Sequence, residues 1–284
     1  MKTTLTKRIG WLGILVFFLN QAYAQPQNEL LLPYLLHDSL AATTTVNSSA
    51  AATVPLQSNV RQYVAEYLDE NAATLEIIKE RNSAKFKTIQ KILVKHGIPA
   101  GLMYLAIVES ELKNSATSRV GAAGIWQLMP ETARTFGLQV NGKTDQRRHM
   151  YHSSVAAAGY LNELYKQFDD WLLVVAAYNC GAGNVYKAIK RSGSREFWKL
   201  QHFLPAETKS HVKHFIATHF YYEENGSIAT LTKAERVKYL ASLNEAVAKD
   251  DESIPVAATP AGNPPSNGVL IAQYEGELRL ELRR

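Results

Sequence analysis

Apolar residues in the central part of this chain recur with the period of an α-helix. Their spacing of three and four positions places them on one helix face: Ala157, Tyr160, Leu161, Leu164, Tyr165 and Phe168. Ser153 or Ser154 is a plausible N-cap for this helix. No comparable stretch alternates as a half-buried strand does. The folded part of the chain is therefore predicted to be all-α, or mainly helical.

Further helices are expected wherever the same period returns. The ranges are 60–68, 82–96, 100–112, 130–136, 171–178, 185–191, 206–223 and 233–248. Residues 270–284 alternate weakly instead, which favours either a short strand or an interaction tail, with no function assigned. No internal repeat is visible.

Two low-complexity stretches enclose the helical part. Residues 41–55 read AATTTVNSSAAATVP, and residues 250–268 gather four prolines among small residues. Neither stretch can bury enough apolar surface to offset its chain entropy. The prediction is a linker region over 25–60, one helical domain over 61–248, and a Pro-rich linker with a C-terminal tail over 249–284. A chain of 284 residues suits one sizeable core.

The N-terminus has the pattern of a secretory signal peptide. Basic residues precede an apolar run from Ile9 to Leu19, and Ala22-Tyr23-Ala24 forms a small-x-small cleavage site. A retained anchor is the alternative, but the run is shorter than the roughly 20 residues that span a membrane. Residues 1–24 are thus predicted to be removed from an exported protein of the periplasm. No cysteine follows the cleavage site to carry a lipid anchor.

Cysteine usage and charge exclude other features. Cys180 is the only cysteine, so no internal disulfide can form and packing must hold the fold. The formal net charge of +5 falls to +2 once the three basic residues of the signal are removed. This balance is too mild to indicate nucleic acid as a partner.

Glu109 is the first candidate for chemistry. It follows the uncharged segment Gly101–Val108, on a helix that looks apolar all round, so it should lie at the edge of the core. Apolar surroundings disfavour the charged carboxylate, and a carboxylic acid that stays protonated can act as a general acid. The alternative is a structural glutamate paired with Lys113 or Arg119, and this segment alone favours neither.

Two further blocks have the composition of a binding site. The stretch from Ser118 to Leu128 is a Gly- and Ala-dense turn, which lets a ligand approach the backbone closely. Within it, Gln127 offers amide groups to sugar hydroxyl or acetamido groups, while Trp126 offers either a flat surface for a sugar ring or simple core packing. Later, Tyr178 and Asn179 end a helix at a glycine-rich turn, where polar groups can face a cleft.

Together these blocks resemble the catalytic domain of the soluble-type lytic transglycosylases, and most closely the membrane-bound lytic murein transglycosylase D group. The resemblance covers about residues 85–224. The matching elements are Glu109-Ser110, the SxxGAxGxxQ stretch from Ser118 to Gln127, Ala177-Tyr178-Asn179, and the block from Leu204 to Thr208.

The resemblance implies a lysozyme-like helical domain with a cleft for glycan strands of peptidoglycan, in a lyase of cell-wall turnover. Glu109 would be the single acid/base. Substrate would be bound by Ser118, Gln127, Met129, Tyr178 and Glu207, with Ser110 and Asn179 in supporting positions. Two positions depart from the family pattern: His149 stands where an acid often follows Asp145 and Arg147, and His211 stands where an aromatic often follows Glu207.

The implied reaction needs one carboxylic acid. Glu109 would protonate the glycosidic oxygen between N-acetylmuramic acid and N-acetylglucosamine, and then remove a proton from the C6 hydroxyl, leaving a 1,6-anhydromuramoyl end. Family resemblance adds assistance from the substrate's acetamido group. The other nearby carboxylates, Glu111, Glu131, Asp145, Glu163, Asp169 and Asp170, are interpreted as surface charges, so the second carboxylate of a typical glycosidase is missing.

Two other functions remain open from the sequence. One is a peptidoglycan hydrolase of the goose-type lysozyme kind, and the other is a non-catalytic peptidoglycan-binding module. His211, His214 and His219 match no compact zinc motif and are interpreted as surface residues, so no metal and no cofactor are expected. Besides peptidoglycan, cell-envelope proteins are candidate partners, since no wall-binding repeat is found. Oligomeric state and the choice between chain-end and internal cleavage are not predicted.

Overall fold

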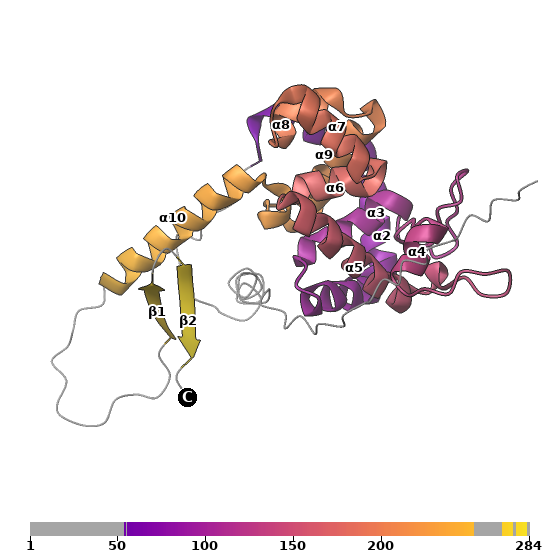
Figure 1. Cartoon of the computed structure of the whole chain (residues 1–284), viewed down its shortest axis with the longest axis horizontal. Helices are drawn as coiled ribbons and strands as arrows, with labels where there is room; N and C mark the ends of the chain where they lie inside the picture. Colours follow the sequence, from indigo (N-terminus) through magenta and orange to yellow (C-terminus); the bar gives the residue numbers. More distant parts are fainter. Residues whose placement is uncertain (1–53, 55, 253–268, 275–276, 283–284) are drawn as a thin grey trace, which may run out of the picture.

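The computed structural model describes residues 54, 56–252, 269–274 and 277–282, and its main body is helical (Figure 1). The predicted signal peptide, nearly all of the 25–60 linker and residues 253–268 lie outside the described residues. The α-helices are α2 (Ser58–Lys95), α3 (Tyr104–Ser110), α4 (Pro130–Thr135), α5 (Met150–Phe168), α6 (Trp171–Cys180), α7 (Ala182–Ser192), α8 (Phe197–Leu200), α9 (Ala206–Glu223) and α10 (Lys233–Glu252). Short 3-10 turns are η1 (Ala100–Met103), η2 (Gln146–Arg148), η3 (Gln201–Phe203) and η4 (Ile228–Thr230). The predicted mainly helical fold is confirmed.

Helix α2 joins two stretches that the sequence analysis kept apart. Residues 69–81 are also helical, and Leu75 and Ile78 bury a narrow apolar stripe within this otherwise polar segment. The helix kinks at Asn82, where φ is −126° and ψ is 16°. The Asn82 side-chain amide donates to the Ile78 carbonyl at 2.9 Å. Side-chain hydrogen bonds to the helix backbone commonly accompany such bends.

The helix carrying Glu109 is shorter than expected. A 3-10 turn covers Ala100–Met103, and α3 ends at Ser110 instead of residue 112. It ends because Glu111 and Leu112 adopt left-handed backbone angles, with φ of 54° and 59°. Such angles are unfavourable for residues with a Cβ, and burial of the Leu112 side chain offsets the cost. Glu109 therefore occupies the last turn of α3.

Helix α5 begins earlier than predicted, so the proposed N-cap at Ser153 or Ser154 is wrong. The cap is His149, whose Nδ1 accepts a hydrogen bond from the His152 amide at 3.4 Å. An imidazole nitrogen thus supplies the acceptor that the family's usual carboxylate would provide. Both serines lie buried in the first turn and donate to backbone carbonyls of that turn.

Helix α6 forms the centre of the core. All residues from Trp171 to Ala177 are buried. The helix packs against α5, α7 and α9, and α3 also packs on α9. This packing brings Glu109 of α3 and Tyr178 of α6 close to the first half of α9.

Helix α10 is fixed to the body at its first turn. Asp170, between α5 and α6, accepts hydrogen bonds from the Leu173 amide at 3.1 Å and from the Lys233 amide at 2.6 Å. Arg236 donates to Asp169 at 2.8 Å. From residue 237 to 245 the helix is half-buried or exposed, and Figure 1 shows it extending away from the other helices.

The C-terminal segment forms strands, which decides between the two interpretations left open. Strand β1 (Val269–Tyr274) pairs antiparallel with β2 (Glu277–Leu282), in a register that places Val269 opposite Leu282 and Tyr274 opposite Glu277. Within the described part of the chain, no helix has both the length and the apolar character needed to cross a membrane.

Candidate active site

Glu109 lies at the edge of the core and contacts a histidine. Its side chain is 14% exposed, and its Oε1 lies 3.0 Å from Nε2 of His211 on α9. Lys113, one of the two basic partners considered from the sequence, pairs with Glu111 at 2.6 Å instead. Arg119, the other, is exposed on the following loop. The surroundings of Glu109 are therefore not those of a structural ion pair with a lysine or arginine.

Tyr178 lies beside Glu109 at the end of α6. Its hydroxyl donates to the Trp126 carbonyl at 2.6 Å. Burial raises the pKa of the Tyr178 phenol well above its ordinary value, and the nearby negative charge of Glu109 raises it further. The phenol thus stays neutral at any working pH, and its hydrogen bond links α6 to the glycine-rich stretch.

We use the name glycine loop for residues 116–128. Gly124 has φ of +78°, and a Cβ there would lie 1.9 Å from the Arg147 carbonyl oxygen, so only glycine fits. Gln127 also has a positive φ, 46°, and its side-chain amide donates to the Gly124 carbonyl at 2.8 Å. Ser110 donates to the Ile125 carbonyl at 2.9 Å, which ties the loop to the end of α3.

Arg147 holds the glycine loop from the opposite side. Its buried guanidinium donates to the carbonyls of Gly121 at 2.7 Å and Leu128 at 3.0 Å. Asp145 receives two further hydrogen bonds from it, at 2.8 and 2.9 Å. These bonds to Arg147 lower the pKa of the Asp145 carboxyl. The interpretation of Asp145 as a free surface charge is therefore wrong, because it orients the arginine that clamps the loop.

Trp126 belongs to the core. Its side chain has no exposed surface, and its indole nitrogen donates to the Ser154 hydroxyl at 2.9 Å. Of the two sequence interpretations, core packing is confirmed and the flat surface for a sugar ring is wrong. The reason is that the turn at Gly124 points the indole inward beneath the loop.

The other predicted site residues occupy different positions. Ser118 accepts a hydrogen bond from the Ala122 amide at 3.0 Å within the glycine loop, and Met129, 42% exposed, follows that loop. Glu207 is exposed in the first turn of α9, one turn before His211 and on the same face. Asn179 accepts from Thr208 at 2.7 Å, which joins the end of α6 to α9. The roles assigned to these residues stay predictions.

The interpretation of His211 and His219 as surface residues is wrong. Both are buried, because they share with Phe215 a face of α9 at four-residue spacing. Burial lowers the pKa of His219 to about 4. The same periodicity that located the helix could have indicated this burial. His214 is half-buried near the rings of Tyr63 and Tyr67, and burial also lowers its pKa.

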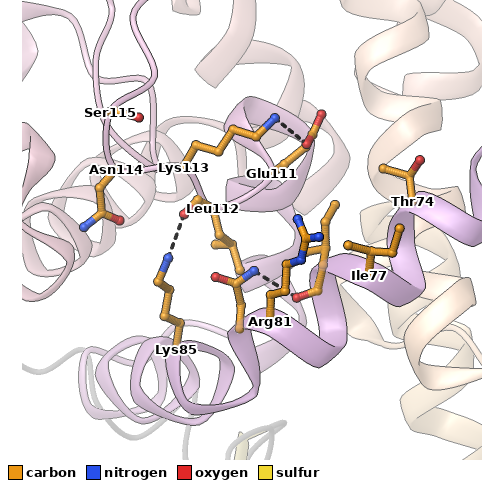
Figure 2. A pocket seen from close by; sticks show the side chains of 11 residues that line it. Thr74, Ile77, Arg81, Lys85, Glu111, Leu112, Lys113, Asn114 and Ser115 are labelled. Carbon is orange, nitrogen blue, oxygen red and sulfur yellow. Dashed lines mark hydrogen bonds and ion pairs between the residues drawn. The ribbon is translucent and has the colours of Figure 1, made fainter.

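A cavity of about 550 Å³ lies elsewhere, between the kink of α2 and residues 111–115 (Figure 2). Its lining includes Arg81 and Lys85, and Lys85 donates to the Leu112 carbonyl at 3.0 Å. None of the predicted site residues lines it. Among the described residues, no group of three or more His, Cys, Asp or Glu side chains could hold a metal ion.

Comparison with known protein families indicates which family this part of the chain resembles. Residues 87–201 match the family described as Transglycosylase SLT domain. Residues 87–201 are thus similar to a transglycosylase SLT domain. The matched residues include Glu109, the glycine loop and Tyr178, whereas α9 with His211 follows them.

Relatives of this SLT domain have related names. Membrane-bound lytic murein transglycosylase D of Escherichia coli K12 is 40% identical over 169 residues, which are 58% of this chain and 37% of that protein. A putative soluble lytic murein transglycosylase of Haemophilus influenzae is 31% identical over 130 residues, covering 43% of this chain and 21% of that protein. The chain thus spans little more than a third of the length of the first relative. The family predicted from the sequence is confirmed.

Solved structures also match in part. The 70 kDa soluble lytic transglycosylase of Escherichia coli superposes with a TM-score of 0.46 and 26% identity, covering 53% of this chain and 26% of that one.

Proposed function

We propose that the SLT domain is a peptidoglycan lytic transglycosylase in which Glu109 is the single acid/base. The observation that carries this proposal is the setting of the Glu109 carboxyl group. It is 14% exposed at the end of α3, beside the neutral Tyr178 phenol and an imidazole, with no lysine or arginine paired to it. The names of the relatives support murein as the substrate class.

In the proposed reaction, Glu109 gives its proton to the glycosidic oxygen as the bond from the anomeric carbon of N-acetylmuramic acid breaks. The resulting carboxylate then takes the proton from the C6 hydroxyl of the same sugar. The C6 oxygen bonds to the anomeric carbon and closes the 1,6-anhydro ring. Glu109 ends protonated again, and water is not consumed.

The neighbouring carboxylates are bonded to other groups, which supports a single-acid mechanism. Glu111 points to a different face from Glu109 and pairs with Lys113. Asp145 orients Arg147, while Asp170 caps α6 and receives the first amide of α10. A hydrolase would need a second carboxylate to hold water or to act as nucleophile. Glu111, Asp145 and Asp170 are each bonded elsewhere, which favours the transglycosylase over the lysozyme-like alternative.

The proposed substrate also implies where the protein acts. Glycan strands of peptidoglycan lie outside the cytoplasmic membrane, which agrees with the expected export signal in residues 1–24. We therefore propose that the protein is exported to the periplasm. In the same proposal, cell-envelope proteins are candidate partners that would hold it at the wall.

Digestion of purified sacculi tests the proposal. The parent protein should release muropeptides with anhydro ends, and Glu109→Gln should lose at least ~100-fold in rate, the scale of an acid–base contribution. Glu111→Gln is the matched control, because it removes an exposed carboxylate two residues away and should keep parental activity. Products heavier by one water would support the hydrolase. Equal, slow release by the parent and Glu109→Gln would support a binding module.

A further inference from the structure

His211 lies on α9 and contacts the proposed acid directly. Its Nε2 lies 3.0 Å from Oε1 of Glu109 across 102 residues of sequence. Its other nitrogen, Nδ1, is enclosed and has no hydrogen-bond partner among the described residues. The two nitrogens therefore have very different surroundings, and this difference decides which of them can carry a proton.

A proton on Nδ1 would be left without an acceptor. A buried donor without a partner costs about 1–3 kcal/mol, and more when it belongs to a charged group. The imidazolium form, which carries protons on both nitrogens, is therefore disfavoured. The neutral form with a proton on Nε2 remains.

We propose that His211 is a positioning residue that donates its Nε2 proton to Oε1 of Glu109 and thereby assigns the catalytic proton to Oε2. This inference rests on the proposed function of Glu109. With Oε1 occupied as an acceptor, the acid proton must sit on the other oxygen, which faces away from His211. After proton transfer, the carboxylate keeps the same neutral donor on Oε1 while Oε2 accepts the proton from the C6 hydroxyl.

The other protonation states of the pair are less suitable. An imidazolium beside Glu109 would hold the carboxyl group ionised, with no proton to give to the glycosidic oxygen. A proton on Oε1 shared with Nε2 would force the imidazole proton onto the enclosed Nδ1. Around the pair, the titratable groups include Tyr178 from α6 and both His214 and the exposed Glu207 from α9, and Tyr178 is neutral.

Two substitutions separate donation from charge. His211→Gln places an uncharged amide donor at a similar reach, whereas His211→Phe keeps a planar ring and removes the donor. We expect His211→Gln to keep kcat within about 3-fold of the parent with an unchanged pH profile. His211→Phe should lose about 10–100-fold in kcat with little change in KM, the scale of one hydrogen bond to a charged group. Thermal unfolding of both variants checks that they fold.

Two outcomes would overturn the proposal. A His211→Phe variant with parental kcat would show that the contact has no role in the reaction. A His211→Gln variant as impaired as His211→Phe, with a shifted pH profile, would show that charge and not donation matters.

A measurement on the parent protein does not depend on activity. Nitrogen-15 NMR of the histidine side chains should show His211 protonated at Nε2 and bare at Nδ1 at neutral pH, and an imidazolium or an Nδ1 tautomer would contradict the proposal. This readout also separates the two proposals. If Glu109→Gln kept full activity, the proposed function would fail, while the tautomer would still report on the contact between His211 and Glu109.

Discussion

Two parts of the molecule lie beside Glu109, and they are held in different ways. The glycine loop is fixed by side chains that donate to its backbone carbonyls, from Ser110, Tyr178, Gln127 and Arg147. Helix α9 is fixed by apolar packing and by contacts between side chains, of His211 with Glu109 and of Thr208 with Asn179. The residues around the glycine loop therefore fix the conformation of its backbone. Those of α9 instead contact the side chains of neighbouring helices.

Gly124→Ala should have the largest effect, because the loop depends on the shape of its backbone. The new Cβ would lie 1.9 Å from the Arg147 carbonyl oxygen, at a φ of +78°. We expect a loss of at least about 4 kcal/mol in the free energy of unfolding, measured in urea. Gly137→Ala is the control: its φ is +83° with nothing within 4 Å, so only backbone strain of about 1–2 kcal/mol should appear. Equal losses in the two variants would contradict the role of close approach.

Arg147→Met should have the second-largest effect on stability. It leaves two loop carbonyls and the Asp145 carboxylate without their donor, so we expect a loss of about 3 kcal/mol in stability. Activity should fall as well, because Tyr178 bonds to the carbonyl of this loop. Arg119→Met removes an exposed guanidinium of the same loop and should cost less than about 1 kcal/mol. A stable, active Arg147→Met variant would mean that the glycine loop keeps its conformation without the Arg147 guanidinium.

Acid should affect the two parts in different pH ranges. The folded-state pKa of His219, about 4, lies below its ordinary value of 6.5, so the unfolded chain takes up the proton first as pH falls. His219 by itself should therefore lower stability from about pH 6.5 to pH 4, by up to about 3 kcal/mol, while buried Asp170, whose pKa is raised by burial to about 6, should act in the opposite sense over much of the same range. Asp145 has a lowered pKa, so the stabilisation from its pairing with Arg147 is present above its ordinary value of 3.8 and is lost only below it.

Urea unfolding between pH 8 and pH 3 measures both windows. His219→Gln should remove the contribution of His219 between pH 6.5 and 4, so that its curve lies above that of the parent at the acid end of this range relative to pH 8, and should leave the drop at lower pH. Asp145→Asn should instead remove the drop at lower pH and leave the upper range unchanged. If His219→Gln left the upper window unchanged, another group would be responsible for it.

Thr208→Val should have the smallest effect. It removes the hydroxyl that donates to Asn179 at 2.7 Å while keeping the shape of a buried side chain. We expect a loss of about 1 kcal/mol in the free energy of unfolding, and thermal unfolding measures it. Thr74→Val, which changes an exposed threonine of α2, serves as the control and should be nearly neutral. If Thr208→Val had the stability of the parent, apolar packing alone would hold α6 against α9.

The sequence predicted helices well where an apolar face is broad. For α9 the predicted and observed bounds agree, and Lys233 begins α10 as expected. Prediction failed where the pattern is narrow or where tertiary contacts decide. Residues 69–81 of α2 expose most of their side chains, and α3 ends on left-handed Glu111 and Leu112 with no glycine to indicate it.

For the site, the position of Glu109 at the core edge could be predicted, because its charge follows an apolar segment. Its contact with His211 could not, since it joins residues far apart in sequence and depends on the packing of α3 against α9. The inward turn of Trp126 likewise depends on Gly124 and Arg147 together, which composition does not reveal.

The attachment of α10 has a mechanical consequence. Helix α10, held at its first turn by bonds to Asp169, Asp170, Tyr165 and Trp198, has a length of about 30 Å for its 20 residues. Any pull on the chain beyond Glu252 would therefore reach the junction of α5 and α6 first, at the opposite end of α6 from Tyr178.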